Sequence, residues 1–236
     1  MNIAVIPARG GSKRIPWKNI RHFCGKPIIA YSIEVAQKTG LFRHVIVSTD
    51  SEKIADTAKN YGAEVPFVRP TNLSDDFTGT GEVTLHALNW VQEHLGAVEY
   101  VCCLYATAPF VQPHYLAEGL FILQKEDAES SFSVTTFPYP IFRALKINER
   151  GRSEMFWPEY KNKRSQDFPE AYHDAGQFYW AKTDCYLKNK RFLSDDAIPI
   201  VIPRYLVQDI DTFEDWKTAE LMFLALQRTN IKTQSC

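Results

Sequence analysis

The 236-residue sequence lacks the features that define several classes of protein. Its five cysteines form no CxxC motif, and Cys102 and Cys103 are adjacent within an apolar run, which predicts reduced thiols rather than a zinc site or a disulfide framework. No apolar run approaches the ~18 residues of a membrane-spanning helix, and no basic segment followed by a long apolar segment opens the chain. We therefore expect a cytoplasmic protein that does not insert into a membrane.

An excess of charge of either sign is also lacking. The 27 Lys and Arg residues nearly balance the 28 Asp and Glu residues, so we expect no general attraction to nucleic acid or to an anionic membrane. The balance is not uniform, because residues 1–33 contain no Asp or Glu. The same window contains the cations Arg9, Lys13, Arg14, Lys18, Arg21 and Lys26. This segment predicts a local site for an anionic ligand.

Apolar residues make up 45% of the chain, which is enough for the core of one domain spanning residues 1–236. Apolar runs alternate with amphipathic segments that end at a glycine, a pattern typical of a largely parallel sheet with connecting helices. The predicted strands are residues 3–6, 44–50 and 100–106, and the predicted helices are residues 27–39, 51–61 and 81–95. The expected fold class is therefore α/β.

The pattern changes near residue 131 to short runs rich in proline and aromatic residues, as in FSVTTFPYPIFRALKI. We interpret residues 131–168 as an antiparallel excursion, after which the sheet resumes near Gly176 and Ile198. The excursion has too many aromatic residues for a solvated loop, so we expect it to face a second copy in a homodimer. These aromatic residues are Phe132, Phe137, Tyr139, Phe142, Phe156, Trp157 and Tyr160.

The last helix is predicted to begin at Thr212. The Thr212 hydroxyl and Asp215, three residues later, form a variant of the capping box. Helical spacing then places Phe213, Trp216, Ala219 and Phe223 against the core.

The segment PARGGSKRIPWKN follows the first predicted strand, where open parallel sheets bind phosphates. It matches neither the GxxxxGK[ST] loop nor the GxGxxG fingerprint. The segment nevertheless suits a triphosphate. Its glycines let backbone N–H groups approach the ligand, and Arg9, Lys13 and Lys18 would surround it. The alternative interpretation is a solvated basic loop.

Near the C-terminus, VQDIDT carries two carboxylates on alternate residues. In an extended segment Asp209 and Asp211 share one face, while Ile210 points into the core. Magnesium commonly uses one or two carboxylates together with phosphate and water, so the pair suits Mg²⁺. Alternatively, Asp211 only favours the dipole of the helix that follows.

The combined motifs resemble those of the CMP-sialic acid synthetase family, the nucleotidylyltransferases that activate nine-carbon ulosonic acids with CTP. IPARGGSKRIPWKNI is similar to the family's N-terminal signature, LYATAPF falls at its Q-P-T-S-P segment, and VQDIDTFEDW resembles its I-D-I-D-T ending. Within the family, EVPFVRPTNLSDDFTGT, VCCLYATAPF and NKRSQDFPEAYHDAGQFYW look most like the members that use pseudaminic acid. The resemblance implies a Rossmann-like nucleotide-diphosphosugar transferase fold, Mg²⁺ dependence and a homodimer.

The resemblance also implies roles for individual residues. The positions that match the triphosphate loop are Ala8, Arg9, Gly10, Ser12, Lys13, Lys18 and Asn19. Arg69 and Thr80 match positions that hold the cytidine, Asp209 and Asp211 match the metal pair, and Arg143 matches a cation facing the sugar. The simpler interpretations are a surface arginine fixed by Pro70 for Arg69, a helix cap for Thr80 and a solvated strand charge for Arg143.

Departures from the family pattern concern the sugar. Tyr105 stands at the Gln of Q-P-T-S-P, Ala108 stands at its Ser with Thr107 before it, and His173 stands at the Arg of an F-R-P-N-G segment. We expect these residues to bind the sugar, and Arg164, Asp174 and Gln177 lie near enough in sequence to share the pocket. His173 alternatively serves only as a structural hydrogen-bonding residue.

The implied reaction is attack of the sugar's anomeric hydroxyl on the α-phosphorus of CTP, with pyrophosphate leaving. Arg9, Lys13 and Lys18 would neutralise the leaving phosphates, and Mg²⁺ on Asp209 and Asp211 would bridge the α-phosphate. No side chain is identified as the general base, and a metal-polarised hydroxyl or proton transfer through water to Asp211 would both serve. Other open readings are activation of sialic or legionaminic acid and, in a different class, a non-catalytic nucleotide-binding regulator.

Overall fold

A mixed six-stranded sheet forms the centre of the computed structural model, which describes the backbone of residues 1–233 and the side chains of residues 1–229. The strands are β1 (Asn2–Pro7), β4 (His44–Ser48), β5 (Tyr100–Leu104), β6 (Ser130–Thr136), β9 (Tyr172–Lys182) and β10 (Ala197–Val201). Their order is β10-β6-β9-β5-β1-β4. β1 is parallel to β4 and β5, β10 is parallel to β6, and β9 runs antiparallel between β5 and β6. The predicted α/β class with a mostly parallel sheet is confirmed.

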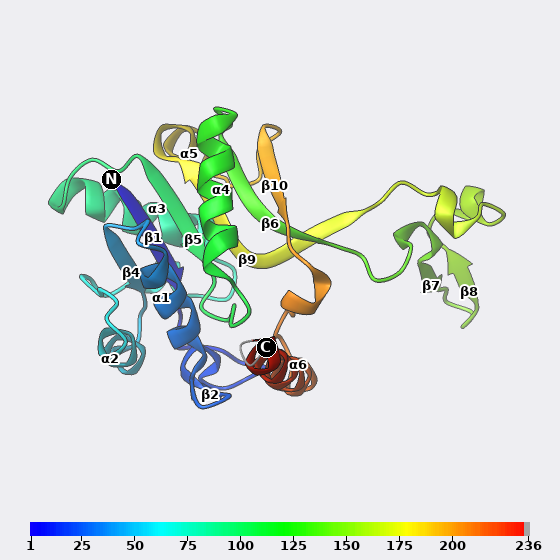
Figure 1. Ribbon diagram of the computed structural model, residues 1–236, viewed down its shortest axis with the longest axis horizontal. Helices are drawn as coiled ribbons and strands as arrows, with labels where there is room; N and C mark the ends of the chain where they lie inside the picture. The colour runs from blue at the N-terminus through cyan, green and yellow to red at the C-terminus, as the bar shows by residue number, and fades with distance from the viewer. Residues whose placement is uncertain (234–236) are drawn as a thin grey trace.

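Helices cover both faces of the sheet (Figure 1). They are α1 (Ile28–Thr39), α2 (Glu52–Asn60), α3 (Thr80–His94), α4 (Pro113–Lys125), α5 (Thr183–Asn189) and α6 (Phe213–Thr233). The two-residue period of β1 supplies both cores: Ala4 and Ile6 pack with residues of α1, α2 and α4, while Ile3 and Val5 pack with residues of α3 and α5. A short hairpin of β2 (His22–Phe23) and β3 (Lys26–Pro27) follows the first loop.

The predicted helices and strands are found within two residues of their expected limits. Gly40, Gly62 and Gly96 follow α1, α2 and α3 with φ angles of 66°, 84° and 113°, the left-handed conformation that glycine adopts without steric cost. β4 and β5 each end two residues before the predicted limit. Their following residues therefore form loops at the carboxyl edge of the sheet, beside the loop after β1.

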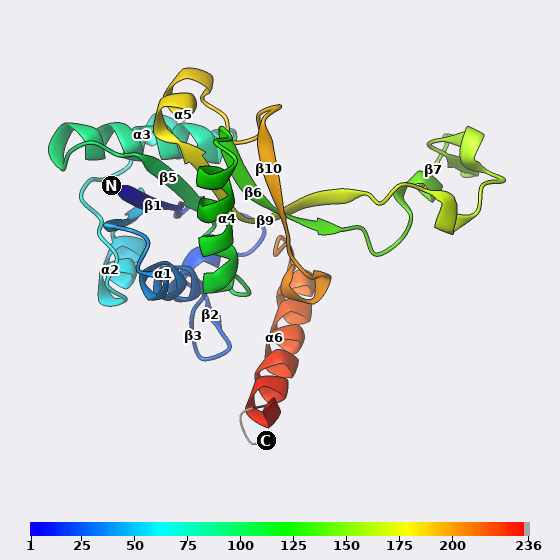
Figure 2. The same ribbon diagram turned by 45° about the horizontal axis from the view of Figure 1, so that its top comes forward.

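The excursion begins later than predicted. β6 belongs to the central sheet, so the segment that leaves the body comprises residues 137–171 rather than 131–168. It contains the antiparallel pair β7 (Leu145–Ile147) and β8 (Ser153–Met155) and projects away from the sheet in both ribbon views (Figures 1 and 2). The alternation of apolar and polar residues in FSVTT is typical of a strand in the central sheet and equally of a strand in the excursion. The sequence pattern therefore placed the start of the excursion too early.

α6 begins as predicted. The backbone N–H of Asp215 donates to the Thr212 hydroxyl at 3.2 Å, and the N–H of Thr212 donates to the Asp215 carboxylate at 2.7 Å. Trp216 and Ala219 are buried and Phe223 is partly buried, but Phe213 is 51% exposed and lies under the Arg21 guanidinium. The prediction that Phe213 faces the core was wrong.

No helix within residues 1–233 is long and apolar enough to span a bilayer.

Candidate active site

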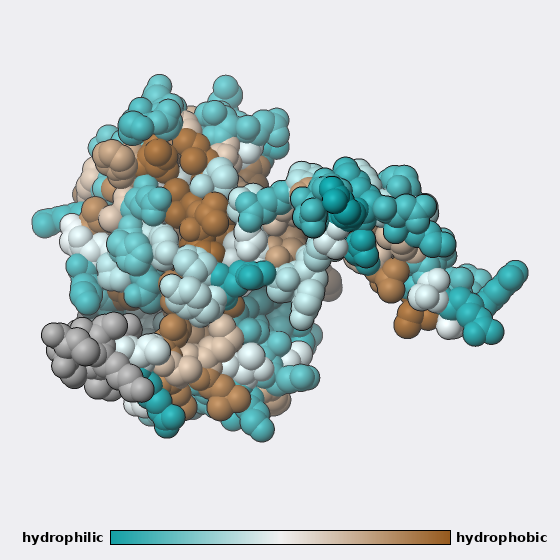
Figure 3. Space-filling view, turned by 45° about the vertical axis from the view of Figure 1, so that its right-hand side comes forward, coloured by the Kyte–Doolittle hydropathy of each residue, from teal (hydrophilic) through white to brown (hydrophobic). Residues whose placement is uncertain are grey.

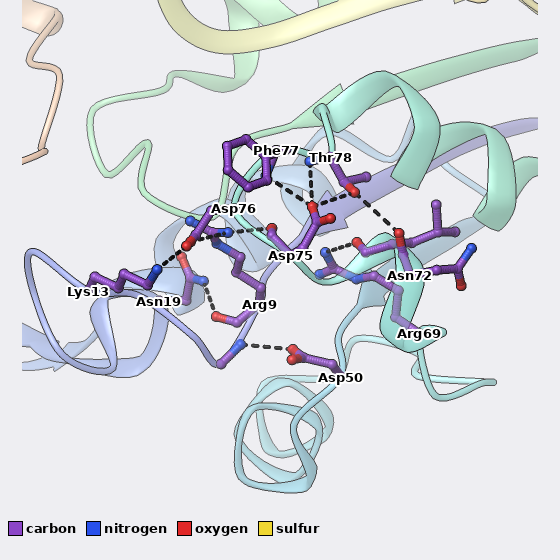
Figure 4. Close-up of polar contacts among 12 residues, drawn as sticks. Arg9, Lys13, Asn19, Asp50, Arg69, Asn72, Asp75, Asp76, Phe77 and Thr78 are labelled. Atoms are coloured by element: carbon purple, nitrogen blue, oxygen red, sulfur yellow. Dashed lines mark hydrogen bonds and ion pairs between the residues drawn. The ribbon is translucent and has the colours of Figure 1, made fainter.

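The loop after β1 is fixed by contacts with its neighbours. The N–H of Gly10 donates to the Asp50 carboxylate at 2.8 Å, and the Asn19 side-chain amide donates to the carbonyl oxygen of Arg9 at 3.0 Å (Figure 4). A Cβ on Gly10 would lie 3.1 Å from the Ser51 Cβ, which explains why a glycine suits this close approach to α2. The loop therefore has a conformation fixed by these contacts and is not a freely solvated loop.

A cavity of about 290 Å³ lies above this loop, and we call it the phosphate cavity. The predicted residues that line it are Arg9, Ser12, Lys13, Lys18, Asn19, Arg69, Thr80, Tyr105, Thr107 and Asp211. Ala8 is buried in the main core beneath the loop, and Gly10 lies in the loop itself. The structure thus brings together predicted phosphate and nucleoside positions, one residue of the predicted metal pair and two residues predicted for the sugar, Tyr105 and Thr107.

Asp76 closes one side of the phosphate cavity. Its carboxylate forms ion pairs with Arg9, at 2.8 Å, and with Lys13 (Figure 4). Lys13 and Arg9 together hold the pKa of Asp76 below its ordinary value. The neighbouring Asp75 carboxylate accepts hydrogen bonds from the backbone N–H groups of Phe77 and Thr78, which shapes the turn. A phosphate group bound here would compete with Asp76 for both cations.

Arg69 is buried at the same cavity, with 4% of its surface exposed. Its guanidinium donates to the carbonyl oxygens of Ser48 and Leu73, while its Nε has no partner. Burial lowers the pKa of Arg69, which shows how strongly the group is desolvated. The interpretation of Arg69 as a surface arginine is therefore wrong. The interpretation of Thr80 as a helix cap is also wrong, because Gly79 occupies the N-cap position.

Lys18 connects the loop to the acidic segment. Its ammonium donates to the carbonyl oxygen of Ile210 at 2.8 Å and lies 3.3 Å from the Asp211 carboxylate, which also pairs with Arg14 at 2.9 Å. Ile210 is 1% exposed, as expected for the residue between two outward-facing carboxylates. Burial and the negative charge of Asp211 raise the pKa of Asp209. A carboxylate whose charge is disfavoured by burial and by a neighbouring carboxylate is a suitable ligand for a divalent cation.

A second cavity, of about 670 Å³, adjoins the phosphate cavity, and we call it the sugar cavity. Tyr105 lines both cavities, and Asp211 lines the first while Asp209 lines the second. The predicted sugar residues His173 and Asp174 also line the sugar cavity. The acidic pair therefore stands where the contents of the two cavities would meet.

Other predicted sugar residues lie elsewhere. Ala108 is 4% exposed and packs in the main core. Gln177 is also buried, and its amide donates to the carbonyl oxygen of Leu206 at 2.6 Å, so it anchors the segment before the acidic pair. Arg143 donates to the carbonyl oxygen of Lys163, and Arg164 pairs with Asp167. Both arginines belong to the excursion and line neither cavity of their own chain.

Residues missed by the sequence predictions are Arg14, Asp76 and Thr78 in the phosphate cavity and Thr136, Tyr179 and Arg204 in the sugar cavity. Arg14 was visible as part of the acid-free window. The others come from segments that meet only in the folded chain.

Comparison with known sequences identifies the family. The family described as "Cytidylyltransferase" matches residues 3–195. This chain belongs to the cytidylyltransferase family. The match covers the loop after β1 and most residues of the sugar cavity, and it ends before Asp209 and Asp211.

Relatives and solved structures agree with this assignment. The chain is 42% identical to a pseudaminic acid cytidylyltransferase of Campylobacter jejuni over 94% of this chain and 96% of the relative. It is 33% identical to a CMP-N,N'-diacetyllegionaminic acid synthase of Legionella pneumophila, covering 92% of this chain and 94% of that protein. A CMP-2-keto-3-deoxy-manno-octonic acid synthetase complexed with CTP has the same fold, with a TM-score of 0.71 and 15% identity over 95% of this chain and 98% of that chain.

Replacing Lys18 tests the link between the loop and the acidic segment. We expect Lys18→Ala to raise the KM for CTP and to lower kcat, by roughly two to three orders of magnitude in kcat/KM, because one ammonium both binds phosphate charge and holds Asp211. The control is Lys26→Ala, which removes an equally sheltered lysine paired with Glu34 outside both cavities. Steady-state pyrophosphate release measures both constants, and equal kinetics in the two variants would contradict the assignment.

Proposed function

We propose that this protein transfers CMP from CTP to pseudaminic acid and releases pyrophosphate. The observation that carries the proposal is the pair of adjoining cavities, which share Tyr105 and receive Asp211 and Asp209 respectively. A cation-rich cavity suits the triphosphate, and the larger cavity beside it suits a nine-carbon sugar. The names of the relatives with 42% identity support the choice of sugar.

The residues of the phosphate cavity have distinct roles in this reaction. Arg9, Lys13 and Lys18 bind the β- and γ-phosphates and stabilise the charge that develops on the departing pyrophosphate. Arg69 and Thr80, which line the same cavity, bind the cytidine end. The anomeric hydroxyl oxygen forms a bond to the α-phosphorus, the bond to the β-phosphate oxygen breaks, and the hydroxyl proton leaves to solvent.

Asp209 and Asp211 fit a bound Mg²⁺. Among residues 1–229, no group of three or more His, Cys, Asp and Glu side chains is arranged to hold a metal, so the ion would take its remaining ligands from phosphate and water. The raised pKa of Asp209 and the two cations on Asp211 fit a site where positive charge is needed. When bound, Mg²⁺ would supply charge neutralisation at the α-phosphate.

The sugar cavity has features that suit pseudaminic acid, which carries two acylamino groups and ends in a methyl group. Tyr105 stands where sialic acid enzymes of the family have a glutamine, so an aromatic ring forms a wall of the cavity in place of a smaller amide. Burial raises the pKa of Tyr105, so its hydroxyl stays neutral. His173 replaces a permanent bidentate cation with a smaller group that donates or accepts. Ala108, which is buried, contributes only through the packing beneath this wall.

Comparison of sugars tests the proposed substrate. We expect kcat/KM for pseudaminic acid to exceed that for N-acetylneuraminic acid by about 10⁴, because sites that lose required hydrogen bonds discriminate on this scale. The measurement is pyrophosphate release under saturating CTP and Mg²⁺, with N,N'-diacetyllegionaminic acid as a third substrate. Equal values, or a preference for either alternative sugar, would contradict the proposal.

Replacing the acidic pair tests the metal assignment. We expect Asp209→Asn and Asp211→Asn each to abolish turnover while keeping most CTP affinity, because the ion serves the transition state more than ground-state binding. EDTA should abolish wild-type turnover and added Mg²⁺ should restore it. Asp127→Asn, which removes an exposed carboxylate paired with Lys182, is the matched control. Near-normal rates in both acidic-pair variants would show that the pair holds no essential metal.

The excursion supports a homodimer. A two-stranded hairpin is only marginally stable alone, and four aromatic residues form a small cluster beside it. These are Phe142, Trp157, Tyr160 and Phe168. Hydrophobic patches nevertheless remain at the surface of the projecting segment (Figure 3). Tyr139 and Ile147 in this segment are each 80% exposed. We infer that a second copy covers them, and that Arg143 and Arg164 face the sugar of that copy.

Sedimentation velocity at micromolar concentration tests the homodimer. We expect the wild-type protein to sediment as a dimer and Ile147→Glu to shift it toward monomer, because a charge would be buried without a partner. Val68→Glu is the matched control, since Val68 is 79% exposed and lies outside the excursion. A wild-type monomer would overturn this inference.

A further inference from the structure

One carboxylate in the sugar cavity is held by two donors. The Asp174 Oδ2 accepts a hydrogen bond from the Tyr179 hydroxyl at 2.7 Å, and its Oδ1 accepts one from the backbone N–H of Gly176 at 2.8 Å. Asp174 and Tyr179 both line the sugar cavity. An exposed aspartate usually samples several rotamers, whereas this one is oriented on both oxygen atoms.

An irregularity in β9 makes this arrangement possible. Phe132 pairs with Tyr179, and Val134 pairs with Asp174, so two steps along β6 correspond to five along β9. In a regular strand, residues five apart point to opposite faces. The extra residues reverse that parity, and Gly176 adopts a φ of 61° within the bulge. Bulges of this kind re-aim side chains near active sites.

Tyr179 is suited to the role of a fixed donor. It is 5% exposed, and its ring lies 5.3 Å from the Tyr105 ring and 5.8 Å from the Phe192 ring. Burial, together with Tyr105 and the Asp174 carboxylate, raises the pKa of Tyr179, so the hydroxyl keeps its proton. Each Asp174 oxygen accepts only one of these hydrogen bonds and retains further acceptor capacity.

We propose that Asp174 accepts a hydrogen bond from the N–H of an acylamino group of the sugar, and that Tyr179 is the positioning residue that orients it. A carboxylate repels the sugar's own carboxylate and therefore faces a part of the sugar that donates. The proposal rests on the proposed function and names the group of the sugar that Asp174 recognises.

Two variants test the proposal by pyrophosphate release. We expect Asp174→Asn to lower kcat/KM for pseudaminic acid about 10- to 100-fold and Tyr179→Phe to lower it about 3- to 10-fold, with the KM for CTP unchanged. Tyr186→Phe is the matched control, because Tyr186 is equally buried and donates to the carbonyl oxygen of Gly81 outside the sugar cavity. An unchanged kcat/KM in Asp174→Asn, or an equal loss in the control, would overturn the proposal.

A substrate series separates recognition from a structural effect. Two analogues of pseudaminic acid, each lacking one acylamino group, are compared in wild type and in Asp174→Asn. The wild type should have a lower kcat/KM for both analogues than for pseudaminic acid. In Asp174→Asn, the analogue that lacks the group bound by Asp174 should no longer have a lower kcat/KM, because the substitution and the missing group remove the same interaction. Identical discrimination in both proteins would refute the role of Asp174. If the wild type does not turn over pseudaminic acid, the proposed function itself fails.

Discussion

The contacts of Lys18 with Ile210 and Asp211 determine where the two parts of the site meet. They join residues about 190 positions apart, from the first loop and from the segment before the last helix. The carbonyl contact fixes the backbone of the acidic segment, and the ion pair orients one of its carboxylates. Because Ile210 is buried between the carboxylates, the segment cannot rotate without exposing a core side chain. Asp211 thus remains at the phosphate cavity and Asp209 at the sugar cavity.

Features governed by local sequence were predictable. Glycines at Gly40, Gly62 and Gly96 ended helices because the left-handed conformation there carries no Cβ penalty, and Thr212 with Asp215 marked the start of α6. The phosphate loop was recognisable from its lack of acids as much as from its cations. Such signals are contained in a few consecutive residues, so they do not depend on the rest of the fold.

Features that depend on pairing between distant segments were not predictable. Asp76 belongs to the loop before α3, and nothing in its own segment indicates that Arg9 and Lys13 are its partners. Tyr179 was missed because it lies five positions after Asp174, and regular strand spacing places the two on opposite faces. Ala108 was expected at the sugar because it stands at the Ser of the family's Q-P-T-S-P segment, and Gln177 because it lies near pocket residues in sequence, but both side chains are buried.

The ion pairs of Asp76 bear on which anions the phosphate cavity retains in the presence of inorganic phosphate. A carboxylate tethered at the cavity competes at high effective concentration, so a small monovalent or divalent anion gains little by replacing it. A ligand that brings several negative charges and also contacts Arg69 gains much more. Under the proposed function, this competition favours a nucleoside triphosphate over simple anions by the number and spacing of its charges.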